Sequence, residues 1–203
     1  MKVKICGITN LADAAVAVES GADAIGLMLF RDSPRSVDPK TARSIVRSLP
    51  PFVAKVGVFV DADEGFVQRM IEETGIDTLQ FHGDESPEFC AQFRLPVIKA
   101  FRIRDRESIA RLKSYATAGW LLDSFVPGKQ GGTGERFNWD LAVEARGLGR
   151  PILLAGGLEP GNIAEAVAKV RPYGVDVSSG VESAPGRKDA AKVRDFISAA
   201  KQA

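Results

Sequence analysis

Short apolar runs recur along the chain and alternate with stretches of helical periodicity. Each run is rich in β-branched or other apolar residues and is bounded by glycine or proline, as is typical of buried strands. The runs that fit this description are residues 2–6, 24–29, 53–60, 77–81, 96–101, 119–123, 151–155 and 174–178. Between the runs, apolar residues return at helical spacing, for example Leu11, Ala15 and Val18. The pattern predicts eight strand–helix units.

Residues that begin and end helices stand at the expected places between these runs. Asn10, Asp38 and Ser86 each precede a helical stretch and can accept a hydrogen bond from its first turn, and the last two are followed by proline. Gly21 and Gly75 follow helical stretches, where glycine commonly ends a helix. The local signals therefore agree with the apolar periodicity.

Strands that are separated by helices pair in parallel, which leaves an open doubly wound sheet or a closed barrel. Eight strands favour closure, and no change in composition indicates a second domain. A flavodoxin-like or Rossmann sheet is the chief competitor, but residues 6–9 after the first run read Cys-Gly-Ile-Thr rather than the glycine-rich dinucleotide motif. We expect an α/β fold, a single (β/α)8 TIM barrel over residues 1–203.

Composition and charge limit the partners. The 203 residues are 45% hydrophobic and carry 27 basic and 26 acidic side chains, so no net field draws the chain to nucleic acid or to a membrane. The start of the chain lacks a signal-type apolar core and no run is long enough to span a membrane, which predicts a cytoplasmic location. Two distant cysteines, Cys6 and Cys90, and a single histidine, His82, support neither a disulfide framework nor a metal site.

Polar residues mark the carboxyl ends of the predicted strands, where barrel enzymes place their active sites. Those at the ends of the first, second, fourth, fifth and sixth strands are Cys6, Arg31, Arg35, Gln80, His82, Arg102 and Asp123. The ends of the seventh and eighth strands differ, because they carry short side chains.

Gly156 and Gly157 follow the seventh strand, and Ser178, Ser179 and Gly180 follow the eighth. Small side chains let an anion approach backbone N–H groups closely, and barrels often bind phosphate after these two strands, beside a short extra helix. Glycines that serve only as turns are the alternative, which is weaker at two adjacent loops. We expect a phosphorylated small molecule as the substrate.

Cys6 and Asp123 are the candidates for acid–base chemistry. A cysteine on a strand is more often an inert small hydrophobe, but at the mouth of a barrel its thiol can accept a proton if its pKa is depressed. Lys4 shares a face with Cys6, and the sequence leaves open whether both point inward. Asp123 ends an apolar strand, where the alternative is a cap or an ion pair. For His82, a structural hydrogen bond and a substrate contact remain equally open.

The connection from Ser124 to Asn138 is long and rich in glycine. Such a segment in a compact domain is expected either to be a lid that closes over a substrate or a surface loop without a function.

Taken together, seven segments resemble those of phosphoribosylanthranilate isomerase. They are KICGIT (4–9), SPRSV (33–37), LQFHG (79–83), LD (122–123), GGTG (131–134), LAGGL (154–158) and VDVSSGVE (175–182). They follow one another in the family's order and span nearly the whole chain. Phe81, where leucine is frequent, and Asn138, where aspartate is frequent, depart from the family's pattern without touching a residue expected to carry chemistry.

The resemblance implies the Amadori rearrangement of N-(5'-phosphoribosyl)anthranilate to 1-(2-carboxyphenylamino)-1-deoxyribulose 5-phosphate in tryptophan biosynthesis, without metal or organic cofactor. It implies Asp123 as general acid and Cys6 as general base. Arg35 would pair with the anthranilate carboxylate, Gln80 and His82 would contact the substrate, and the glycine loops would hold its phosphate. We expect a monomer rather than a homodimer.

Three other readings remain open. A class I aldolase on the same barrel would use Lys4 or Lys99 as a Schiff-base nucleophile. A phosphate-binding module would leave Cys6 as a sensor or as part of the core. An extended specificity toward the related aminoaldose isomerisation of histidine biosynthesis is a third, although that family relies on two aspartates. A metal-dependent epimerase is disfavoured by the single histidine.

Overall fold

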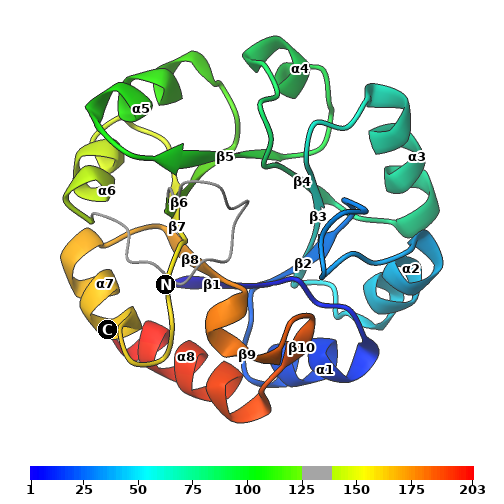
Figure 1. The fold of residues 1–203 in the computed structure, drawn as a ribbon. Coiled ribbons are helices and arrows are strands. Elements are labelled where there is room, and N and C mark those ends of the chain that lie inside the picture. Colours follow the sequence, from blue (N-terminus) through cyan, green and yellow to red (C-terminus); the bar gives the residue numbers. More distant parts are fainter. Residues whose placement is uncertain (125–138) are drawn as a thin grey trace.

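The computed structural model describes residues 1–124 and 139–203 and has a closed parallel barrel. Each strand pairs with the next along the chain, and β8 pairs with β1 to close the ring (Figure 1). The strands are β1 Lys2–Cys6, β2 Ala24–Met28, β3 Ala54–Phe59, β4 Thr78–Phe81, β5 Val97–Ile103, β6 Gly119–Ser124, β7 Ile152–Leu154 and β8 Gly174–Val177. All eight predicted strands are confirmed.

Helices follow the strands and form an outer ring around the barrel (Figure 1). Their bounds are α1 Leu11–Glu19, α2 Pro39–Ser48, α3 Glu64–Thr74, α4 Pro87–Ala91, α5 Arg106–Ala110, η1 Arg111–Ser114, α6 Trp139–Arg146, α7 Ile163–Val170, η2 Ser179–Val181 and α8 Ala190–Gln202. A small antiparallel hairpin of β9 Glu182–Ala184 and β10 Arg187–Lys188 stands apart from the barrel sheet. Among the described residues, no helix has both the length and the apolar character to cross a membrane.

The predicted helix boundaries are confirmed at their first and last turns. The side chains of Asn10, Asp38 and Ser86 each accept a hydrogen bond from a backbone N–H in the first turn of α1, α2 and α4. Gly75 ends α3 with a φ of 78°, and Gly21 has a φ of 98° just after α1. Both values lie in the left-handed region, which glycine enters without a Cβ penalty.

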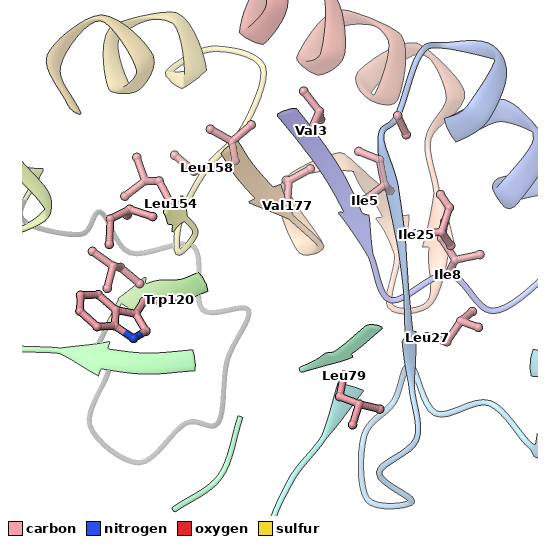
Figure 2. Packing of buried hydrophobic residues seen from close by; sticks show 14 of the residues in the cluster. Val3, Ile5, Ile8, Ile25, Leu27, Leu79, Trp120, Leu154, Leu158 and Val177 are labelled. Atoms are coloured by element: carbon pink, nitrogen blue, oxygen red, sulfur yellow. The ribbon is translucent and has the colours of Figure 1, made fainter. Parts of the chain in front are cut away.

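The period of two along each strand separates an outer from an inner layer. Val3, Ile25 and Val177 belong to the main core between strands and helices, part of which is shown in Figure 2. The alternate positions face the barrel interior, where Ala100 and Leu121 pack together with Ala155. The last inward-facing side chain of each strand therefore lies at the carboxyl edge of the barrel.

The 125–138 connection, including the GGTG segment and the expected lid, lies outside the described residues.

Candidate active site

One cavity at the carboxyl ends of the strands brings together most of the residues that the sequence placed at the active-site end of the barrel; Arg31, which is exposed, is not part of its described lining. Its described lining includes Cys6, Arg35, Gln80, His82, Asp123, Gly156, Gly157, Ser178, Ser179 and Gly180. These residues come from β1, β4 and β6 and from the segments that follow β2, β4, β7 and β8. Because the barrel is closed, strand ends that are distant along the chain surround one space.

Lys4 points into the barrel, which settles the orientation that the sequence left open. Its side chain is buried, and Nζ lies 2.8 Å from Asp176 Oδ1. A Cβ on Gly26 of the neighbouring strand would come within 2.7 Å of Cys6 Sγ and 3.0 Å of Lys4 Nζ. The absence of a side chain at Gly26 thus makes room for the thiol and the ammonium group side by side.

The pKa of the Cys6 thiol is raised above its ordinary value. Burial raises this pKa, the positive charge of Lys4 opposes the rise, and the negative charge of Asp176 adds to it. The pKa of Lys4 is itself raised, because Asp176 and Cys6 outweigh the lowering by burial. The depressed pKa that a general base would require is therefore not found in this structure, since desolvation outweighs the nearby ammonium group.

Asp123 and His82 face each other inside the cavity. His82 Nε2 lies 3.3 Å from Asp123 Oδ2, an ion-pair distance if the imidazole is protonated, and this nitrogen has no hydrogen-bond partner among residues 1–124 and 139–203. On the other side of the ring, His82 Nδ1 lies 3.3 Å from Gln80 Nε2. Asp123 Oδ1 accepts a hydrogen bond of 2.8 Å from the N–H of Ser124. The carboxyl group is thereby fixed in direction, with its second oxygen toward the imidazole.

The loops after β7 and β8 have the backbone geometry that glycine permits. Gly156 and Gly157 have φ values of 79° and 65°, and a Cβ on Gly180 would overlap the carbonyl oxygen of Leu158. Ser178 Oγ is buried and has no hydrogen-bond partner among the described residues. The short helix η2 begins at Ser179, in agreement with the extra helix expected there. Small side chains thus let the two loops approach each other at the cavity wall.

Arg35 is held by an ion cluster that the sequence analysis missed. Its Nε and Nη2 donate to the two carboxylate oxygens of Glu182 at 2.8 and 2.7 Å, and Lys188 Nζ donates to the same carboxylate at 2.9 Å. Burial lowers the pKa of Lys188 more than Glu182 raises it. Glu182 closes the 175–182 segment, but nothing in the sequence pairs it with a residue 147 positions earlier.

The hairpin of β9 and β10 ties this cluster to the first strand–helix segment. Thr9 Oγ1 donates to the carbonyl oxygen of Gly186 at 2.6 Å, and Asp13 accepts from the N–H of Lys188 at 2.8 Å. The segments that follow β1, β2 and β8 are therefore connected beside the cavity.

The two lysines of the aldolase alternative are already engaged. Lys99 Nζ lies 3.2 Å from Glu85 Oε2 and donates to the carbonyl oxygens of Gly83 and Ala100 at 2.8 and 2.9 Å. Neither Lys99 nor Lys4 belongs to the described lining of the cavity. The geometry gives no support to a Schiff-base lysine here.

Cys90 lies on α4 in the main core, as expected, and burial raises the pKa of its thiol to about 11. Within residues 1–124 and 139–203, no group of three or more His, Cys, Asp and Glu side chains is arranged to hold a metal ion.

Taken as a whole, the cavity combines a thiol, a carboxyl group and an imidazole with glycine-rich backbone suited to an anion. Such an arrangement can move protons on a ligand that is anchored by a phosphate. The chemistry belongs to the site rather than to the barrel, which hosts many activities.

The family model described as N-(5'-phosphoribosyl)anthranilate (PRA) isomerase matches residues 3–199. The N-(5'-phosphoribosyl)anthranilate isomerases of Geobacter sp. (strain M21) and Geobacter sulfurreducens are 57% and 53% identical to the chain over 201 residues, which is 99% of this chain and 98% of each relative.

Solved structures agree with the sequence comparisons. Phosphoribosyl anthranilate isomerase from Thermotoga maritima superposes with a TM-score of 0.94 at 41% identity over 100% of both chains. A phosphoribosyl anthranilate isomerase in complex with reduced 1-(o-carboxyphenylamino)-1-deoxyribulose 5-phosphate gives a TM-score of 0.91 at 40% identity, again over 100% of both chains. A 3-hexulose-6-phosphate synthase, with a TM-score of 0.72 at 17% identity, shares the fold alone.

The family model covers almost the whole chain, and relatives that are more than half identical align with it from end to end. The chain is therefore an isomerase that belongs to the N-(5'-phosphoribosyl)anthranilate isomerase family.

Proposed function

We propose that the chain catalyses the Amadori rearrangement of N-(5'-phosphoribosyl)anthranilate to 1-(2-carboxyphenylamino)-1-deoxyribulose 5-phosphate, with Asp123 as general acid and Cys6 as general base. The observation that carries the proposal is that both side chains line one cavity, whose wall includes the glycine loops after β7 and β8. A solved structure of a family member in complex with the reduced form of this product supports the choice of ligand.

In the first step, protonated Asp123 donates a proton to the ribose ring oxygen. The bond between that oxygen and C1 breaks, its electrons stay on the oxygen, and the nitrogen lone pair forms an iminium ion with C1. His82, 3.3 Å from Asp123, is placed to exchange a proton with the carboxyl group. Ring opening thus needs only one proton from the enzyme.

In the second step, the Cys6 thiolate removes the proton from C2, which the iminium ion has made acidic. The electrons of the C–H bond form the enolamine, which tautomerises to the ketone when C1 gains a proton. Burial makes the thiolate costly, and Lys4 is the cation that lowers this cost. We therefore assign Lys4 a positioning and electrostatic role in the proposal, held in place by Asp176.

The remaining site residues bind substrate in this proposal. Backbone N–H groups around Gly156, Gly157, Ser178, Ser179 and Gly180 receive the phosphate, because their loops allow close approach. Arg35 pairs with the anthranilate carboxylate through the part of its guanidinium that Glu182 leaves available. Gln80 and His82 contact the sugar from β4 and the segment after it.

The test combines turnover with binding. Loss of the anthranilate fluorescence of N-(5'-phosphoribosyl)anthranilate reports turnover, and titration with reduced 1-(o-carboxyphenylamino)-1-deoxyribulose 5-phosphate reports binding. We expect Cys6→Ala and Asp123→Asn each to lower kcat by roughly 10²- to 10⁴-fold while the Kd changes by only a few-fold. Cys90→Ala is the matched control, because this thiol lies on α4 in the core away from the cavity. Retained turnover in both site variants would contradict the assignment.

A cytoplasmic monomer is part of the same proposal. The large hydrophobic side chains that are exposed among the described residues are Met1, Leu11, Phe52 and Tyr173, and no two of them share a helix. Isolated exposed apolar side chains are ordinary on monomers. One solved relative from Thermotoga maritima is described as a dimeric isomerase that was made monomeric. Light scattering on the purified chain decides between the two states.

A further inference from the structure

A second cavity adjoins the active site and shares two residues with it. This annex cavity lies beside β5, α5 and η1, and both His82 and Arg102 line it together with the main cavity. His82 and Arg102 therefore stand at the border between the two cavities.

Arg102 points into the barrel beside the proposed general acid. Ala100, two residues earlier on β5, packs in the barrel interior against Leu121 of β6. The period of two places Arg102 on the same inner face as Ala100, and Asp123 on the same face as Leu121. The register of the two strands pairs Arg102 with Asp123.

The guanidinium of Arg102 is incompletely satisfied. Its Nε is fully buried and has no hydrogen-bond partner among the described residues. Arg35 differs, because its Nε and Nη2 are already bonded to Glu182. An unpaired buried donor costs free energy, and a ligand group that accepts its hydrogen bond removes that cost.

The charges around the annex cavity favour an anion. Its described lining contains Lys99, Arg102, Arg104 and Arg111, and Asp84 is the one carboxylate among these lining residues. Lys99 is compensated by Glu85, which lies 3.2 Å away. A cavity with this excess of positive charge suits a carboxylate, which accepts two parallel hydrogen bonds from arginine.

The geometry of the proposed reaction indicates which anionic group of the substrate would lie beside Arg102. The phosphate is assigned to the loops after β7 and β8, and the reacting carbons lie between Cys6 of β1 and Asp123 of β6. In the order β5–β6–β7–β8, Arg102 of β5 lies on the side of Asp123 that is away from the phosphate loops, where the aromatic acid of a substrate held in this way can be received.

We propose that Arg102 is a specificity-determining residue that binds the anthranilate carboxylate, so that Arg35 is not the sole cation for this group. This inference rests on the proposed function and adds a second recognition point to it. Arg102 selects a substrate with an ortho-carboxylate and takes no part in proton transfer.

The experiment compares two ligands on matched variants. Kd is measured by calorimetry for reduced 1-(o-carboxyphenylamino)-1-deoxyribulose 5-phosphate and for the analogue that has a phenyl ring without the carboxylate. Arg102→Ala is expected to raise the Kd of the carboxylated ligand by roughly 10- to 100-fold and to change the Kd of the phenyl analogue by less than about threefold. Arg106→Ala, which removes a guanidinium that is 84% exposed, is expected to leave both values unchanged.

A second variant and turnover data complete the test. Arg102→Lys keeps the charge and loses the planar arrangement of donors, so its loss of affinity should be smaller than that of Arg102→Ala and should again affect the carboxylated ligand alone. This variant also replaces the alanine variant in the test if the alanine variant does not fold. In turnover, KM for N-(5'-phosphoribosyl)anthranilate should rise while kcat changes little. Equal losses for the two ligands, or no loss for either, overturn the inference. Failure of the proposed function would show separately, as absence of turnover by the unaltered chain.

Discussion

Removing the charge of Glu182 should measurably destabilise the fold. The carboxylate accepts hydrogen bonds from Arg35, from Lys188 and from the N–H of Gly186, and its side chain is 5% exposed. Lys188 is still more buried, with a side-chain exposure of 1%. In Glu182→Gln, two cations lose their counter-charge while the shape of the side chain is kept. Breaking a buried ion pair on one side costs about 3–5 kcal/mol, so we expect a loss of about 3 kcal/mol for this conservative change.

Urea denaturation at pH 7, followed by tryptophan fluorescence, measures this loss as a lower midpoint with an unchanged m-value. Glu144→Gln is the matched control, because Glu144 pairs with Arg106 on the surface at 3.1 Å. Exposed pairs contribute about 0–1 kcal/mol, so the control should stay near the unaltered protein. If Glu182→Gln is destabilised by less than about 1 kcal/mol, the cluster does not stabilise the fold as argued.

The same cluster predicts how the effect depends on pH. Burial alone would raise the pKa of Glu182, but the hydrogen bonds from Arg35 and Lys188 hold it below its ordinary value of 4.5. A carboxyl group with a lowered pKa in the folded state contributes stability above its ordinary pKa, and this contribution is lost as the pH falls through the folded value. The difference in the free energy of unfolding between the unaltered protein and Glu182→Gln should have its full size at pH 7 and should become smaller below about pH 4.5. A difference that stays constant at lower pH would contradict this account.

Three further predictions concern single positions. Gly180→Ala should lower the free energy of unfolding by about 1–3 kcal/mol, because its Cβ would overlap the carbonyl oxygen of Leu158; a thermal melt that matches the unaltered chain would contradict the stated contact. Asp38→Ala removes the cap that bonds Thr41 N at 3.0 Å and should lower the midpoint of urea denaturation, with Asp38→Asn as the conservative control. Cys90 should resist iodoacetamide at pH 8 in the folded protein and react after denaturation, since it is buried and its pKa is raised to about 11; mass spectrometry of labelled peptides measures this.

The eight strands could be predicted from the sequence because their signals are local. Apolar runs with glycine or proline at their borders lie within a few residues of one another, and caps such as Asn10 act on the next turn. Strand ends also predicted that Cys6, His82 and Asp123 would meet, since a closed barrel places the carboxyl ends of its strands around one cavity.

Other features depended on contacts between distant parts of the chain. The direction of Lys4, its pairing with Asp176 at a separation of 172 residues, and the hold of Glu182 on Arg35 follow from barrel closure and from the β9–β10 hairpin, which no local pattern encodes. The pKa of Cys6 belongs to the same class. The sequence shows a nearby lysine, but only the three-dimensional packing determines how much water the thiol loses, and that loss of hydration raises its pKa above the ordinary value.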